Sequence, residues 1–155
     1  QRNALERIRK AGTKLTEGMD RLTEAEEVCN KMVAQLKGVE GKPADSLRKA
    51  SNAILDEIKK IRESINGKTS DKQGITRSPF EVTVMTQLQN AMQSINAKMM
   101  APGAQEEKLI QNAEEAIRKT VTEINTLFSS KWVDYRKQVE ETKVNLFKEY
   151  SPISE

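Results

Sequence analysis

Residues 105–150 read QEEKLIQNAEEAIRKTVTEINTLFSSKWVDYRKQVEETKVNLFKEY. Apolar and small side chains recur there every three or four residues, which places them in one stripe along a helix. The stripe contains Ile110, Ala113, Ile117, Val121, Ile124, Phe128, Trp132, Tyr135, Val139, Thr142, Leu146 and Tyr150. We therefore predict one long helix, with the rest of the chain packed against it.

Three further helices precede this stretch. The same spacing of apolar residues predicts helices over about residues 1–37, 45–66 and 79–100, with the last helix over about 105–150. Gly38 and Gly67 mark the ends of the first two. Ser78 and Glu81 have the spacing of a capping box, with Pro79 suited to the first helical position. Residues 1–155 are thus predicted to form a single all-α domain.

Short connections between these helices favour an antiparallel, up-down-up-down four-helix bundle with long first and last helices. In that arrangement the first and last helices run in opposite directions, and the numbers of facing residues sum to roughly 141. The apolar residues beyond Glu140 would then face nothing in this chain. We therefore expect either a bend near Ser129 and Ser130 or a contact from another chain.

The residue chemistry predicts no catalytic, cofactor-binding or metal-binding residues. The chain has no histidine and one cysteine, Cys29, which lies on the apolar stripe of the first helix and is interpreted as a buried, unreactive thiol. The segment Gly67-Lys68-Thr69-Ser70 lacks the first glycine of a phosphate-binding loop. The methionines Met85, Met92 and Met99 have core spacing, and paired glutamates are sequence neighbours that diverge on a helix. We therefore predict no enzymatic activity for this chain.

Charge and hydropathy indicate which partners to expect. The net charge is +3, from 26 basic and 23 acidic residues that are interspersed along the chain, which argues against nucleic-acid binding. No apolar run approaches the ~20 residues of a membrane span. Because the chain begins with Gln1 and is in helical register by Leu5, it is interpreted as a fragment of a larger protein.

The aromatic residues are the best candidates for an interaction surface. Phe128, Trp132 and Tyr135 share one helix face, and Phe147 and Tyr150 follow on the tail. One interpretation is structural, with Ile75 and Phe80 from the loop 68–78 packing onto Phe128, Trp132 and Tyr135. The other is a docking surface for another domain, since Trp and Tyr favour interfaces. The candidate loop residues are Gly74, Ile75, Arg77, Ser78 and Pro79.

Two short motifs carry a family resemblance. The loop Gln73-Gly74-Ile75-Thr76-Arg77-Ser78-Pro79, followed by Trp132-Val133-Asp134-Tyr135-Arg136, resembles the C-terminal helical region of large bacterial proteins, many from Bacteroidetes. These proteins contain BNR or sortilin-type repeats and are often described as glycosyl-hydrolase-like. The resemblance implies that β-propellers precede this region in an exported protein, located in the periplasm, at the cell surface or outside the cell. It implies no active-site residue in this chain.

These observations favour a non-catalytic accessory or interaction module of a larger exported protein. Its partner would be the upstream domains of the same protein or a second copy of the chain. A homo-oligomerising coiled-coil scaffold is an alternative, favoured by the overhanging helix pair. A periplasmic sensor bundle is another, and Glu26 on the first seam is the polar group that would face its ligand. The sequence names neither the ligand nor the parent protein's activity.

Overall fold

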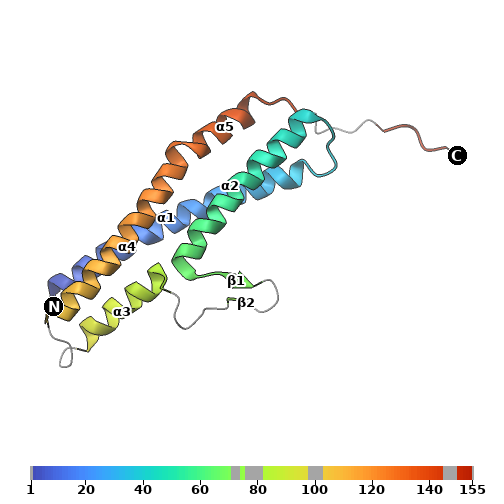
Figure 1. The fold of residues 1–155 in the computed structure, drawn as a ribbon. Coiled ribbons are helices and arrows are strands. Elements are labelled where there is room, and N and C mark those ends of the chain that lie inside the picture. Colours follow the sequence, from blue (N-terminus) through green and yellow to red (C-terminus); the bar gives the residue numbers. More distant parts are fainter. Residues whose placement is uncertain (1, 71–73, 76–81, 98–102, 145–149, 155) are drawn as a thin grey trace.

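The computed structural model describes residues 2–70, 74–75, 82–97, 103–144 and 150–154. Within them the chain forms five helices and a short hairpin (Figure 1). The helices are α1 (Arg2–Gln35), α2 (Lys42–Asn66), α3 (Val84–Asn96), α4 (Gly103–Ser129) and α5 (Lys131–Glu141). Between α2 and α3, β1 (Thr69–Ser70) pairs antiparallel with β2 (Gly74–Ile75). The predicted all-α bundle with a long first helix is confirmed.

The helices are arranged as three legs of similar length (Figure 1). The first leg is α1, with 34 residues. The second is α2 followed by α3, with 25 and 13 residues, and the third is α4 followed by α5, with 27 and 11. In Figure 1, α2 and α3 run one after the other in the same direction, and the hairpin projects from their junction. Both parts of the second leg contact α1 and α4, and α2 also contacts α5.

The direction of the legs corrects the predicted topology. Contacts between the first and third legs pair Arg7 with Glu114, Gly18 with Ile124, and Cys29 with Tyr135. The residue numbers rise together, so α1 runs parallel to α4 and α5, whereas the up-down-up-down prediction made the first and last helices antiparallel. The prediction assumed that every break reverses the chain. The break between α2 and α3 does not, because both helices lie along α1.

The parallel arrangement gives the first part of the predicted unpaired tail, as far as Val144, a partner in this chain. The end of α5 lies beside the turn that joins α1 to α2, where Val139 and Val144 pack against Leu36 and Leu47. The helix ends at Glu141 and not at Tyr150, and the C-cap Thr142 has extended backbone angles. A helix that continued past this turn would have no leg to pack against, and packing supplies most helix stability.

A break near Ser129 and Ser130, as predicted, separates α4 from α5. Ser130 has φ −122° and ψ −85°, outside the helical region. Both serine hydroxyls donate to the carbonyl of Thr126, at 3.3 Å from Ser129 and 2.6 Å from Ser130. Such side-chain bonds compete with the helix ladder and often bend it. The bend lets α5 lean towards α2, where Lys131 pairs with Glu57 at 2.9 Å.

The start of α3 differs from the prediction. The helix begins at Val84, and its capping box is formed by Thr83 and Thr86. The backbone N–H of Thr86 donates to the Thr83 hydroxyl at 3.1 Å, and the Thr83 N–H donates to the Thr86 hydroxyl at 2.8 Å. The predicted box of Ser78 and Glu81 lies outside the described residues. The sequence thus contains two capping motifs whose first residues, Ser78 and Thr83, are five positions apart. The helix begins after the second motif.

The turn between α1 and α2 is held by hydrogen bonds from a side chain of α2, which the sequence analysis did not predict. Gly38 and Gly41 adopt positive φ angles, which free the chain to turn. Arg48 of α2 then donates to the carbonyls of Leu36 and Val39, the former at 2.9 Å. Both carbonyls follow the last residue of α1, and that of Leu36 also accepts from the Val39 N–H at 3.0 Å. Arg48 therefore ties the turn after α1 to the neighbouring helix.

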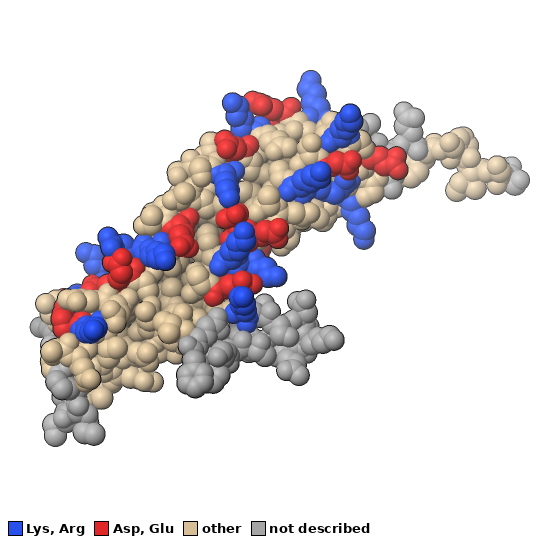
Figure 2. Space-filling model, in the orientation of Figure 1, with Lys and Arg blue, Asp and Glu red and all other residues tan. Residues whose placement is uncertain are grey.

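Three apolar clusters fill the bundle from end to end. A central cluster joins all three legs, a second lies where α3 meets α4, and a third lies under the α1–α2 turn. On the surface, basic and acidic side chains are interspersed over the visible face (Figure 2). None of the described helices is long and apolar enough to cross a membrane.

Candidate interaction surface

Phe128, Trp132 and Tyr135 form a continuous row of rings across the α4–α5 break. The Phe128 and Trp132 rings meet edge to face, with centroids 5.7 Å apart. Trp132 and Tyr135 are tilted, with centroids 5.6 Å apart. The predicted clustering on one face is therefore correct in geometry, and we call these three residues the aromatic row.

Tyr135 anchors the row in the core. Its side chain is 4% exposed, and its hydroxyl lies 2.7 Å from the Ser51 hydroxyl of α2. Ser51 also donates to the carbonyl of Leu47 at 2.8 Å, and either hydroxyl can act as the donor between Ser51 and Tyr135. The Cys29 thiol of α1 is also hydrogen-bonded to Tyr135. One hydroxyl thus ties together residues from all three legs.

Burial keeps both ionisable members of this network protonated. It raises the pKa of Tyr135 to about 12, although the hydrogen bond with Ser51 opposes the shift. Burial also raises the pKa of the Cys29 thiol, against the opposing effect of its bond with Tyr135. Since a thiolate is the reactive form, this environment supports the interpretation of Cys29 as an unreactive core residue.

The spacing between the first and third legs accounts for the large aromatic side chains at the level of Tyr135. At Gly18 the two helices touch, because a Cβ atom there would lie 2.8 Å from Cδ1 of Ile124. Ala25, seven residues on, is also buried. Beyond the break α5 lies closer to α2 than to α1. Large side chains fill the wider gap, and Tyr135 reaches Cys29 across it.

Phe128 and Trp132 remain partly exposed at the outer edge of this gap. Phe128 lies two heptads after Glu114, which pairs with Arg7, so it is on the side of α4 that faces α1. Val28 of α1 precedes Cys29 and therefore lies at the level of Tyr135; its side chain is 47% exposed. We call Val28, Phe128 and Trp132 the aromatic patch. Val133, 51% exposed, lies next to it in sequence.

Three of the other predicted candidates lie in the described part of the chain, namely Tyr150, Gly74 and Ile75. Tyr150 is 87% exposed and lies beyond α5, while Phe147 lies outside the described residues. Gly74 and Ile75 form β2, and Arg77, Ser78 and Pro79 lie outside the described residues, as does Phe80. The loop leaves α2 at Gly67, sixteen residues after Ser51, which is ~24 Å along a helix. The predicted register placed the aromatic row beside this loop. In the structure the row is therefore not beside the start of the loop.

Glu26 is not a buried polar group. Its side chain is 39% exposed and lies 3.7 Å from Nε of Arg62, which also donates to the Thr23 hydroxyl at 3.0 Å. Among the described residues the buried polar ones are Ser51, Thr83, Ser94 and Thr120, and Ser51 is the most completely buried, at 0% exposed. The sequence held a signal for it, since Ser51 falls between Leu47 and Ile54 on the apolar seam.

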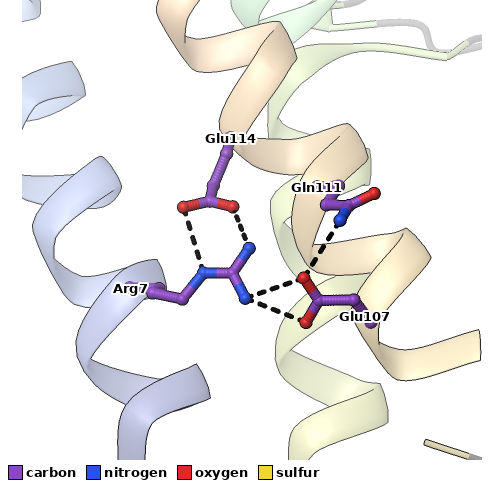
Figure 3. Close-up of polar contacts among 4 residues, drawn as sticks. All are labelled: Arg7, Glu107, Gln111 and Glu114. Atoms are coloured by element: carbon purple, nitrogen blue, oxygen red, sulfur yellow. Dashed lines mark hydrogen bonds and ion pairs between the residues drawn. The ribbon is translucent and has the colours of Figure 1, made fainter. Parts of the chain in front are cut away.

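The first and third legs are also joined by a charged network at their beginnings (Figure 3). The Arg7 guanidinium lies between two carboxylates of α4, donating to Glu107 at 2.8 and 2.9 Å and to Glu114. Gln111 donates to Glu107 at 3.1 Å. The hydrogen bond with Arg7 is the main cause that lowers the pKa of Glu107. This network fixes the two helix starts side by side.

Among the described residues, no three His, Cys, Asp or Glu side chains gather as metal ligands would. Met85 and Met92 are half-buried against the apolar clusters, and Met99 lies outside the described residues. Comparisons with known proteins found no family model that matches the chain, and no significant match among curated proteins or solved structures.

Proposed function

We propose that this chain is a non-catalytic helical interaction module and that the aromatic patch is its docking surface. The observation that carries the proposal is the partial exposure of Phe128 and Trp132, with the exposed Val28 of α1 at the level of Tyr135. Apolar aromatic side chains at the rim of a bundle dominate binding energy when a partner covers them. The charged side chains elsewhere on the bundle offer weaker contacts, because exposed ion pairs contribute little.

The support beneath the patch favours tight docking. Trp132 is held between Phe128 and Tyr135, and Tyr135 is fixed by its hydrogen bond to Ser51. A side chain that is already ordered loses little conformational entropy when a partner binds. Trp132 would therefore act as a rigid anchor, with Phe128 and Val28 as its apolar surroundings.

We propose the preceding domains of the same polypeptide as the partner. Trp132 belongs to the motif Trp132-Val133-Asp134-Tyr135-Arg136, which carries the resemblance to proteins with BNR or sortilin-type propellers. In that context the module would lie in the periplasm, at the cell surface or outside the cell. Any hydrolase-like chemistry would belong to the propellers, and the bundle would serve as their accessory.

The test is site-specific photo-cross-linking in the longer polypeptide that contains this sequence. A photoreactive residue at Val28 should form cross-links to segments preceding Gln1, identified by mass spectrometry. A matched probe at the exposed Lys59 of α2 should not. Cross-links from Val28 that stay within this chain would contradict the docking proposal.

The non-catalytic part of the proposal has its own test. The 155-residue chain is incubated with glycoside and peptide substrates, and no turnover is expected. Reproducible turnover that a single substitution abolishes would overturn this part and leave the docking surface to be judged by cross-linking.

Two alternatives lose part of what favoured them. The coiled-coil scaffold rested on an overhanging helix pair and on the apolar tail; the parallel arrangement of α1 and α4 leaves no such overhang, and residues 145–149 of the tail lie outside the described residues. The sensor bundle rested on Glu26, which pairs with Arg62 at the surface. A thermal-shift screen in which a small ligand stabilises the chain would return the sensor bundle to consideration.

A further inference from the structure

Helix α3 stands out because it carries no charge. Residues 82–97 contain no Asp, Glu, Lys or Arg, although 32% of the whole chain is charged. The exposed positions of α3 are carboxamides instead, namely Gln89, Asn90, Gln93 and Asn96. In Figure 2 the visible surface over α3 is accordingly neither blue nor red. Depletion of charged residues is the compositional signal of an interface core.

A groove lies beside this uncharged face. It has a volume of about 570 Å³ and runs between α3 and α4. Asn90, Gln93 and Ser94 line it from α3. From α4 it is lined by Gln105, Asn112 and Lys108, and Lys108 is its one charged lining residue. Ser94 is 9% exposed, and its hydroxyl has no hydrogen-bond partner among the described residues. Buried hydroxyls normally have a partner, so the groove offers a bonding position that this chain leaves open.

The side chains on the exposed face of α3 indicate which partner binds there. We propose that the carboxamide face of α3 is where a second copy of this chain docks, with the two α3 helices related by a two-fold axis. In such a contact each surface meets itself, so like charges would face each other on any charged patch. A carboxamide avoids this conflict, because each group is both donor and acceptor and can pair with the same group of another copy. Val82, 74% exposed at the start of α3, adds apolar area.

The size of α3 sets the expected strength. A helix of 13 residues is ~20 Å long, and one helix pair of that length buries less than a standard protein interface. The dimer should therefore be weak and reversible, with a dissociation constant roughly in the micromolar range. The proposal is independent of the aromatic patch, which lies on α1, α4 and α5.

Sedimentation velocity of the 155-residue chain over a concentration series tests the proposal. The sedimentation coefficient should rise with concentration for the wild type. Gln93→Lys places two like charges across the axis and should keep the chain monomeric over the same range. The matched control Gln35→Lys, at an exposed position on α1, should associate like the wild type. A wild-type chain that stays monomeric, or Gln93→Lys that associates equally well, overturns the proposal.

Disulfide trapping gives a second readout that does not depend on affinity. Cys29 is buried, so a cysteine placed at Gln93 would be the accessible thiol. Mild oxidation should convert Gln93→Cys to a covalent dimer, whereas Gln35→Cys should remain mostly monomeric. Equal dimer yields from the two variants would contradict the assigned face. Circular dichroism of each variant confirms that the fold is retained.

Discussion

A Cβ atom built on Gly18 would lie 2.8 Å from Cδ1 of Ile124, so α1 and α4 approach so closely that a side chain on α1 would have to displace the end of Ile124. Gly12, two turns earlier on α1, has no neighbour within 4 Å of the same position. These two glycines therefore have the same helix propensity and opposite surroundings, which makes them a matched pair.

Replacing each glycine with alanine should separate helix propensity from packing. Gly12→Ala should raise the free energy of unfolding by about 1 kcal/mol, because alanine is the better helix former. Gly18→Ala gains the same amount but overpacks the core at a typical cost of about 1–3 kcal/mol, so it should be neutral or destabilising. Urea denaturation measures both.

Shortening Ile124 provides the control for this pair. Ile124→Val removes Cδ1 and should cost about 0.5–1.5 kcal/mol by itself. In that background Gly18→Ala should become stabilising, since the clashing atom is gone. If Gly18→Ala stabilises the wild type as much as Gly12→Ala does, the close approach of α1 and α4 is contradicted.

The sequence predicts where the helices begin and end better than it predicts the direction in which each helix runs. Periodicity with Gly38 and Gly67 as stops placed two helices over residues 1–37 and 45–66, and the structure has α1 at Arg2–Gln35 and α2 at Lys42–Asn66. The break at Ser130 followed from local chemistry in the same way. The direction of α3 depends on which distant helices it packs against, and periodicity carries no information about that.

The lengths of the predicted helices nevertheless indicated one feature of the arrangement. The second and third predicted helices were each about half as long as the first, so placed end to end they match it. For the site, the clustering of Phe128, Trp132 and Tyr135 followed from helical spacing. The partners Ser51 and Cys29 did not, because they lie on other legs and the predicted register was antiparallel.

The contact between Tyr135 and Ser51 should appear as a coupling energy. Tyr135→Phe removes one partner of this hydrogen bond and should lower the free energy of unfolding by about 1 kcal/mol. Ser51→Ala leaves the buried Tyr135 hydroxyl without this partner and should cost about 1–3 kcal/mol. The double variant should cost less than the sum of the two. Strictly additive losses in a double-mutant cycle would show that the hydroxyls do not interact.

Alkaline pH should destabilise the fold through the same hydroxyl. The pKa of Tyr135 is about 12 in the folded state and about 10 when exposed, so the unfolded chain loses its proton first as the pH rises. Stability is therefore full below pH 10 and falls by about 2 to 3 kcal/mol between pH 10 and 12. Tyr135→Phe should flatten this fall, whereas lysine titration affects both proteins alike. Parallel stability curves for the two proteins would refute the assignment.

Arg7 should stabilise the bundle more than Arg21, another arginine of α1. Arg7 joins α1 to Glu107 and Glu114 of α4, whereas the ion pair of Arg21 is with Glu17 of its own helix. Arg7→Ala should therefore lower the urea midpoint more than Arg21→Ala at low salt, and added salt should shrink the difference.

The folded pKa of Glu107 is lowered by Arg7. The stability that Glu107 contributes is therefore present above its unfolded pKa and is lost as the pH falls through its folded pKa. The difference between the variants should thus also shrink in acid. Equal midpoints at neutral pH and low salt would contradict the parallel pairing of α1 with α4.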